Sequence, residues 1–235
     1  MVQETPAKKE MVQNMFNNIA PKYDLLNHLL SAGIDKGWRR KVRKALTGSH
    51  PETILDVATG TGDLAIELAK MPAKKIIGID IAEDMLEIGR KKVQKKGLSD
   101  IIVLEPGDSE DIHYADNYFD AITVAFGVRN YENLEKGLRE MQRVLKPGKK
   151  VAILEFSKPA AFPMKNLYRF YFNHILPTIG RMVSKDDSAY TYLPQSVARF
   201  PENEDFLHIL LKTGFKNPFQ KRLTFGIATL YVAEK

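Results

Sequence analysis

The segment ILDVATGTGD at residues 54–63 carries the clearest structural signal in this chain of 235 residues. Its first five residues are mostly aliphatic, which is typical of a buried strand. Gly60 and Gly62 follow at once, and glycines in this place let the backbone turn tightly and let a ligand approach the main chain. The segment therefore indicates a strand, a glycine turn and the start of a helix, with either a bare turn or a ligand site at the junction.

The alternation of strand and helix continues beyond this segment. Apolar runs at 75–80, 101–104, 119–125 and 149–155 indicate further strands, and helical patterns separate most of them. Parallel strands need crossover connections, which helices usually supply. We therefore predict an α/β fold with a mostly parallel sheet covered by helices on both faces.

The pattern divides the chain into four segments. Residues 1–50 have helical spacing, with Pro21 expected to end the first helix, and form an N-terminal helical cap. Residues 51–158 form the α/β core. Residues 159–200 are aromatic-rich and interrupted by proline, so we expect a helical insert there. Residues 201–235 supply a last helix and two β-like runs that complete the core.

The composition is that of an ordinary globular protein. Hydrophobic residues make up 44% of the chain, and no apolar stretch approaches the roughly 20 residues that a membrane-spanning helix needs. The polar first ten residues argue against a secretory signal and favour the cytoplasm. Cysteine is absent, and the five histidines show no metal-ligand spacing, so we expect no metal. The net charge of +6 would suit an anionic membrane or nucleic acid without deciding between them.

An acidic residue ends the second expected strand. Asp80 lies about 20 positions after the glycines, where a carboxylate can accept hydrogen bonds from both hydroxyls of a ribose. Dinucleotides and S-adenosylmethionine share this layout, and residues 60–65 also satisfy the dinucleotide fingerprint in its Ala-ended form. The acid makes a bare turn the weaker interpretation but leaves both ligand classes open.

Other acidic residues favour S-adenosylmethionine. Asp56 ends the first strand, where it could meet the ammonium of a methionine moiety, and Asp63 opens the next helix. Two carboxylates would repel a pyrophosphate but not a ligand with a sulfonium and an ammonium. Asp108 follows the third strand and can accept from an adenine amino group, while Ser109 donates a backbone N–H to the ring. A nicotinamide-dependent oxidoreductase is therefore the weaker alternative.

Longer motifs carry a resemblance to a known family. The series ILDVATGTGD, GIDIAEDML, GDSEDIHYADNYFDAI, FGVRN and RVLKPGKKVAILEFSKP is similar to the class I methyltransferases. With FNNIAPKYDLLNHLLSAGIDKGWR, YRFYFNHILPTIG, SAYTYLPQSVARFP and LTFG, essentially the whole chain resembles the UbiE/MenG and Coq5 quinone C-methyltransferases. It departs from them at Asp108-Ser109, where many members have Asn-Ala, and at LKPGKK, where LKPGG is commoner; both departures keep the needed groups.

The resemblance implies a Rossmann-like, seven-stranded, mostly parallel sheet with S-adenosyl-L-methionine as methyl donor. It also implies methylation of a ring carbon of a prenylated quinol. We prefer demethylmenaquinol because the motifs look bacterial and no organelle transit peptide is present; a ubiquinol precursor is the alternative. An RNA methyltransferase is weaker, since we find no RNA-binding module. Cofactor contacts are expected from Asp56, Gly60, Thr61, Gly62, Asp80, Ile81, Asp108, Ser109 and Ala125.

Three residues are candidates for handling the acceptor ring. Arg129 and Asn130 follow the fourth strand at the carboxyl edge of the sheet. A nearby cation lowers the pKa of a phenol, so Arg129 would stabilise the ionised ring and Asn130 would orient a ring oxygen. Alternatively, Arg129 pairs with an acid to hold the loop. Tyr23 would close over the site or serve as a core aromatic. No residue stands out as a general base, although His174 of the insert could lie near the acceptor.

Two surfaces are candidates for the prenyl tail and for a membrane. The insert would line an apolar channel for the tail, or else pack on the sheet or in a dimer interface. Its apolar residues are Phe162, Met164, Leu167, Tyr168, Phe170, Tyr171, Phe172, Ile175 and Leu176. A helix around Trp38 would rest on anionic lipid at the inner face of the membrane, or be a solvated face. Its cations are Lys36, Arg39, Arg40, Lys41, Arg43 and Lys44. The expected partners are a prenylated quinol and an anionic membrane, and we expect no nucleic acid. The length of the prenyl chain and the oligomeric state stay open, and a homodimer is one of the alternatives.

Overall fold

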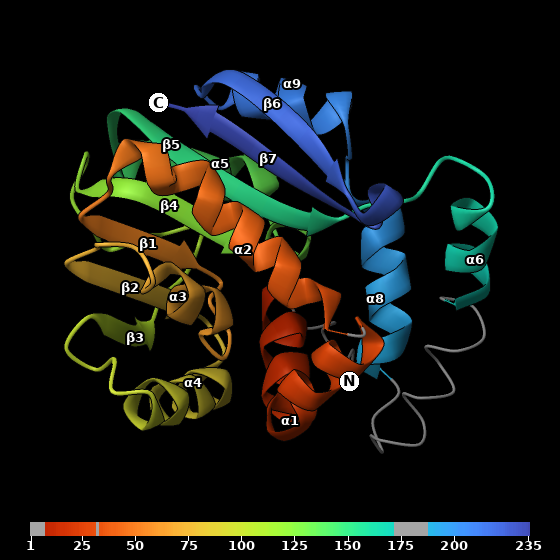
Figure 1. Ribbon diagram of the computed structural model, residues 1–235, viewed down its shortest axis with the longest axis horizontal. Coiled ribbons are helices and arrows are strands. Elements are labelled where there is room, and N and C mark those ends of the chain that lie inside the picture. The colour runs from red at the N-terminus through yellow and green to blue at the C-terminus, as the bar shows by residue number, and fades with distance from the viewer. Residues whose placement is uncertain (1–7, 32, 172–187) are drawn as a thin grey trace, which may run out of the picture.

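A computed structural model describes residues 8–31, 33–171 and 188–235. These residues form one seven-stranded sheet in the order β3-β2-β1-β4-β5-β7-β6 (Figure 1). The strands β1 to β5 pair in parallel, and β7 runs antiparallel to both β5 and β6. The strands are β1 Thr53–Val57, β2 Lys75–Asp80, β3 Ile102–Pro106, β4 Phe119–Ala125, β5 Leu145–Phe156, β6 Lys216–Leu223 and β7 Ala228–Glu234. The mostly parallel sheet predicted from the sequence is confirmed.

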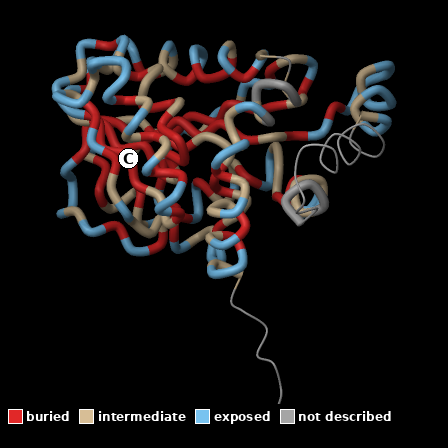
Figure 2. Tube along the Cα trace, turned by 90° about the horizontal axis from the view of Figure 1, so that it is seen from below, coloured by how far each residue is buried: buried red, intermediate tan, exposed pale blue. Residues whose placement is uncertain are grey.

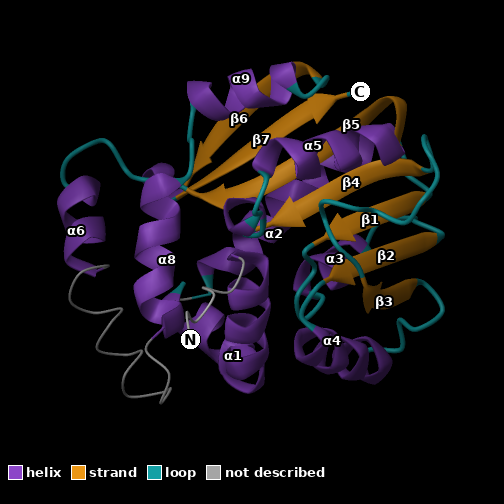
Figure 3. Cartoon of the chain, turned by 180° about the vertical axis from the view of Figure 1, so that it is seen from behind, coloured by secondary structure: helices purple, strands orange, loops and turns teal. Residues whose placement is uncertain are grey.

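Helices cover both faces of this sheet. One face carries α5 and α9, and the other carries α2, α3 and α4, as Figure 3 shows from behind. The helices are α1 Lys8–Leu30, α2 Ile34–Leu46, α3 Asp63–Leu68, α4 Glu83–Lys95, α5 Leu134–Val144, α6 Met164–Phe170, α8 Ser188–Arg199 and α9 Glu204–Lys212. No helix in the described ranges is long and apolar enough to cross a membrane.

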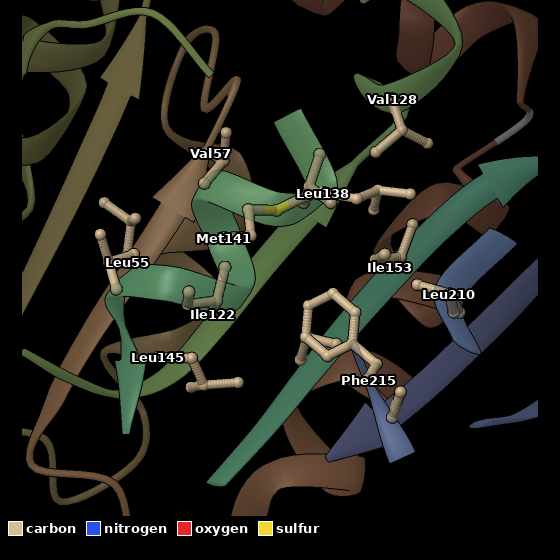
Figure 4. Packing of buried hydrophobic residues seen from close by; sticks show 14 of the residues in the cluster. Leu55, Val57, Ile122, Val128, Leu138, Met141, Leu145, Ile153, Leu210 and Phe215 are labelled. Carbon is tan, nitrogen blue, oxygen red and sulfur yellow. The ribbon is translucent and has the colours of Figure 1, made fainter. Parts of the chain in front are cut away.

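The core consists of two apolar layers, one on each face of the sheet. Side chains alternate along a strand, so β1 supplies Leu55 and Val57 to one layer and Ile54 to the other. In Figure 4, Leu138 and Met141 of α5 gather over the first of these layers. The buried residues concentrate in the sheet and the inner sides of its helices (Figure 2), so the strand ends are held on a rigid scaffold.

The order of the strands determines where a ligand site can form. The chain passes from β1 outward to β2 and β3, and then returns to place β4 on the other side of β1. The connections after β1 and β4 therefore lead to opposite faces, which opens a crevice at the carboxyl ends of these two strands. The glycine turn predicted at residues 58–62 lies at this switch point.

The expectation that Pro21 ends the first helix is wrong. Helix α1 continues through Pro21 to Leu30. A proline within a helix removes one backbone hydrogen bond, but the carbonyl that Pro21 frees belongs to the half-buried Asn17 and can reach water. Packing against the start of α4 compensates: Ala20 is buried with Met85, and Tyr23 packs against the same cluster.

Candidate active site

A first cavity lies between α1 and the carboxyl ends of β1, β2, β3 and β4. It encloses about 690 Å³, including space open to solvent, which is within the usual range for a small-molecule site. Most of the residues proposed from the sequence to contact the cofactor or acceptor lie in its wall. They are Tyr23, Gly60, Asp80, Ile81, Asp108, Ser109, Ala125 and Asn130.

The loops after β1 and β2 are joined through the Asp80 carboxylate. Its Oδ2 accepts from the Gly60 N–H at 2.8 Å, and its Oδ1 accepts from the Ala82 N–H at 2.9 Å. Burial raises the pKa of Asp80, against the effect of these backbone donors. Gly60 has φ +55°, and a Cβ there would lie 3.2 Å from the Met85 methyl group. The backbone thus needs glycine here, and the fixed carboxylate is presented to the cavity.

Three of the expected cofactor residues do not line this cavity. Asp56 is only 1% exposed and accepts from the Thr59 and Thr123 hydroxyls at 2.7 Å each, so it braces the glycine turn from beneath. Burial raises its pKa to about 6. Thr61 donates to the Asp24 carboxylate of α1 at 2.6 Å, and Gly62, with φ +76°, shapes the turn before α3.

The acidic residue Asp63 also has partners within the protein. It forms ion pairs with Lys92 of α4 and, at 3.4 Å, with Arg39 of α2. Asp56 and Asp63 are both expected from the sequence to be charges that face a ligand. In the structure both carboxylates are engaged by hydroxyls or cations, so their repulsion of a pyrophosphate is reduced.

Helix α1 covers the first cavity and is bonded to the loop after each of three strands. Lys9 forms an ion pair with Asp108 after β3, and the Gln13 amide donates to the Ile81 carbonyl after β2 at 2.6 Å. Asp24 accepts from Thr61 after β1. These contacts could not be predicted from local patterns, because they join residues far apart in the chain.

A second cavity adjoins the first and encloses about 760 Å³, open space included. It lies between α1, α2, α8 and the ends of β4 and β5, and Tyr192 and Leu193 bring α8 into its wall. Its aromatic residues are Phe16, Tyr23, Trp38, Phe126, Phe156 and Tyr192. Of these, Phe126 and Phe156 stack with ring centroids 4.4 Å apart. Tyr23, proposed from the sequence to close over the site, borders both cavities.

Arg129 lies in the wall of the second cavity, not the first. Its Nη1 donates to Glu155 Oε1 at 2.8 Å and to the Phe126 carbonyl, so it pairs with an acid and holds the loop after β4. Its Nε is buried without a hydrogen-bond partner among the described residues. The proposed role toward a ring oxygen stays a prediction.

Glu155 is the charged residue that sequence reasoning missed. It is the last residue but one of β5, is fully buried, and also accepts from the Phe156 N–H at 2.8 Å. Burial raises its pKa, while the charge of Arg129 opposes that effect. Its position as an acid at the carboxyl end of a strand, within the EFSKP motif, was the signal available.

Asn130 faces the first cavity with an unused acceptor. Its side-chain N–H donates weakly to the Phe126 carbonyl at 3.4 Å, while its Oδ1 is buried without a partner among the described residues. Buried acceptors are normally paired, so this oxygen suits a donor group of a ligand.

The insert and the histidines are only partly described. Phe172, His174, Ile175 and Leu176 lie outside the described residues. Within the described ranges, no group of three or more His, Asp or Glu side chains could hold a metal ion.

Known proteins resemble this chain over nearly its whole length. The model of the ubiE/COQ5 methyltransferase family matches residues 4–235. The demethylmenaquinone methyltransferase of Bacteroides fragilis is 51% identical over 229 residues, covering 97% of this chain and 94% of that protein. The ubiquinone/menaquinone biosynthesis C-methyltransferase UbiE of Geotalea daltonii is 49% identical over 230 residues and covers 97% of each.

Two solved structures share the fold at low sequence identity. The [4+2]-cyclase SpnF superposes with a TM-score of 0.71 at 18% identity, covering 98% of this chain and 97% of that one. A SAM-dependent methyltransferase from Aquifex aeolicus gives a TM-score of 0.55 at 23% identity, covering 82% and 88%. At these identities the likeness shows the fold alone.

Proposed function

Because this chain belongs to the ubiE/COQ5 methyltransferase family, it is an S-adenosylmethionine-dependent methyltransferase, and we propose that its acceptor is demethylmenaquinol. The methyl group would go to a ring carbon and give menaquinol. The observation that carries the proposal is the pair of adjoining cavities. The first cavity has hydrogen-bond acceptors that suit a nucleoside, and the second is lined by aromatic rings.

The first cavity fits S-adenosylmethionine. Each Asp80 carboxylate oxygen accepts one backbone N–H and keeps capacity for a further donor, such as a ribose hydroxyl. The Asp108 carboxylate can accept a hydrogen bond from an adenine amino group. Lys9, its ion-pair partner, would then share the carboxylate with the adenine or move away from it. The buried Asn130 Oδ1 is a third acceptor that lacks a donor. S-adenosylmethionine supplies, when bound, a methyl group on a positively charged sulfur that a carbon nucleophile can attack.

The second cavity fits an apolar quinol ring. The stacked pair Phe126 and Phe156 offers a flat apolar wall, and Tyr23 borders both cavities. A carbon beside an ionised ring hydroxyl is a good nucleophile, and a site that excludes water favours an attack that disperses charge. Much of the rate enhancement would then come from holding the ring in line with the donor.

Glu155 reduces the electrostatic effect that Arg129 would have on the acceptor ring. A cation lowers the pKa of a phenol, but the carboxylate 2.8 Å from Nη1 offsets much of this effect. We therefore assign Arg129 chiefly to orienting a ring oxygen through its remaining N–H groups. Burial raises the pKa of Tyr23, so its hydroxyl stays protonated and can donate.

The equivalent methylation of a ubiquinol precursor is the second candidate. The relative from Geotalea daltonii, 49% identical, is named for both ubiquinone and menaquinone biosynthesis. Peripheral contact with an anionic membrane also belongs to the proposal, because a prenylated acceptor is dissolved in lipid.

Methyl transfer from labelled S-adenosylmethionine to reduced demethylmenaquinone in detergent tests the proposal. We expect label in the organic extract only after the quinone has been reduced, since the oxidised ring has no hydroxyl to ionise. Label that appears equally with oxidised quinone would contradict the phenolate chemistry. No label with either form, despite tight binding of S-adenosylmethionine, would remove this acceptor and leave the ubiquinol precursor to be assayed in the same way.

A further inference from the structure

We propose that residues 157–171 and the turn between β6 and β7 form one surface that docks on an anionic lipid bilayer. The inference rests on the proposed function, because it explains how an acceptor dissolved in lipid reaches the second cavity. It also moves the membrane contact away from α2, where the sequence had suggested it.

The surface exposes large apolar side chains at two separate places in the chain. Phe162 is 83% exposed and Phe225 is 78% exposed, the highest values for any large hydrophobic residue in the described ranges. Leu167 of α6 is 58% exposed. In Figures 1 and 3, α6 lies at the periphery, outward of α8. Phe162 and Leu167 lie within six residues of chain, and exposed apolar side chains grouped in this way mark an interaction site more often than an average surface does.

The turn that carries Phe225 is built to hold its side chain outward. Thr224 and Phe225 have φ +46° and +57°, a conformation that is unfavourable for residues with bulky side chains. Anchors on both sides keep it: the Trp38 indole N–H donates to the Thr224 hydroxyl at 2.8 Å, and the Ser157 hydroxyl donates to the Gly226 carbonyl at 2.8 Å. Strain that the surroundings maintain is a sign of a selected feature.

Backbone contacts join the turn to the segment that leads into α6. The Ser157 N–H donates to the Ile227 carbonyl at 2.9 Å, and the Arg222 guanidinium donates to the Lys158 carbonyl at 2.6 Å. Ser157 directly follows Phe156, which lines the second cavity. The surface therefore begins where the wall of the proposed acceptor site ends.

The charge of this surface identifies a bilayer as its partner. Residues 157–171 and 219–227 contain no Asp or Glu. Their cations are Lys158, Lys165, Arg169, Lys221 and Arg222. Lys158 pairs with Glu202 at 3.4 Å and Arg222 is engaged by the Lys158 carbonyl, which leaves Lys165, Arg169 and Lys221 for an external partner. Exposed aromatic and aliphatic groups on segments whose own charged residues are all cations match a membrane interface with anionic headgroups.

The basic helix α2 is less suited to this role. Arg39 is buried and pairs with Asp35, and Arg43 donates to Glu67 at 2.9 Å. Its buried face, with Trp38 and Val42, packs on the sheet. The exposed face of α2 carries three lysines and one arginine, and it has no large aromatic side chain that could insert into a bilayer.

Vesicle flotation with the full chain tests the proposal. The wild type should bind vesicles containing phosphatidylglycerol and bind neutral phosphatidylcholine vesicles far less. The apolar variant Phe162→Ser/Phe225→Asn and the charge variant Lys165→Gln/Arg169→Gln should each lower binding about tenfold or more. Asn tolerates positive φ, so the first variant does not strain the turn.

Matched controls separate docking from a general loss of apolar or basic surface. Leu211→Ser/Phe219→Ser removes side chains that are 50% and 54% exposed on α9 and β6. Lys91→Gln/Lys95→Gln removes two exposed cations one turn apart on α4, as Lys165 and Arg169 are on α6. Both controls should bind anionic vesicles like the wild type.

Three outcomes would overturn the proposal: a wild type that stays unbound, controls that lose as much binding as the test variants, and variants that change self-association in sedimentation instead. Methylation of a short-chain, water-soluble quinol by the same proteins keeps the two proposals distinct. The charge variant Lys165→Gln/Arg169→Gln and both control variants should methylate it at the wild-type rate. If the wild type fails to methylate it, the proposed function falls, while vesicle binding is still judged by flotation.

Discussion

Replacing Glu155 by glutamine should show how much the buried ion pair at the proposed acceptor site contributes to the free energy of unfolding. Glu155 is 0% exposed and Arg129 only 7%, so neither charge can be solvated if the other is removed. Breaking such a pair typically costs 3–5 kcal/mol of unfolding free energy, since the remaining charge is buried without compensation. The glutamine oxygen still accepts one of the hydrogen bonds, so we expect a loss of about 3 kcal/mol.

The assay is urea unfolding at neutral pH, with Glu234→Gln as the matched control. Glu234 also pairs with a cation on β5, Lys150, but the pair spans 3.7 Å and both side chains are more than a third exposed. Exposed pairs of this kind contribute about 1 kcal/mol or less. A loss for Glu155→Gln no larger than that of Glu234→Gln would refute the reasoning, because the charge of Arg129 would then need no buried partner.

A double variant separates stability from positioning. Arg129→Leu/Glu155→Gln removes both charges, and substitution of a whole buried pair is often close to neutral. We expect it to be more stable than Glu155→Gln alone while turnover stays low. If turnover recovers together with stability, the pair serves folding and has no role in placing the ring.

Three further predictions concern the two cavities and the loop beneath them. Arg129→Leu should lower turnover far more than the affinity for S-adenosylmethionine, because Arg129 lines the second cavity and is absent from the wall of the first; equal losses in kinetics and calorimetry would contradict its placement. Asp80→Ala should weaken cofactor binding by roughly tenfold to a hundredfold, the value of one or two hydrogen bonds to a charged group, with thermal unfolding as the check on folding. For Asp56, whose folded pKa of about 6 lies above its unfolded value of 3.8, the folded state binds the extra proton between these values, so this group adds stability as pH falls through about 6. The stability of wild type relative to Asp56→Asn should therefore rise by about 1 kcal/mol from pH 7 to pH 5 in urea unfolding, and an unchanged difference would show that the carboxyl does not titrate there.

The sheet and the glycine turn could be predicted because their signals are local. Gly60 follows a buried strand and Asp80 ends the next one, and both lie in the wall of the first cavity. The range predicted for the fourth strand, 119–125, coincides with β4. Periodicity and turn chemistry determine such features within a few residues of chain.

The features that could not be predicted depend on contacts between distant segments. Pro21 lies inside α1 because packing on α4 outweighs the lost hydrogen bond, and local pattern carries no trace of that packing. The ion pair of Lys9 with Asp108 spans 99 positions, and that of Arg129 with Glu155 spans 26. The acidic residue was visible in the sequence, but nothing in its neighbourhood indicated that it would meet Arg129.

The two cavities also explain why the fold and the family carry different amounts of information about function. SpnF, a [4+2]-cyclase, shares this fold over 98% of the present chain, so the sheet and its switch point do not by themselves specify methyl transfer. What a chain does with this scaffold depends on the wall that faces the second reactant. In the proposed acceptor site that wall combines Phe126, Phe156 and Arg129, and the buried Glu155 holds Arg129 in place. Since α1 borders both cavities through Phe16 and Tyr23, a change in the fit of α1 would alter donor and acceptor sites together. Specificity for the quinol should therefore reside in α1, α8 and the loops after β4 and β5, and not in the glycine turn that identifies the fold.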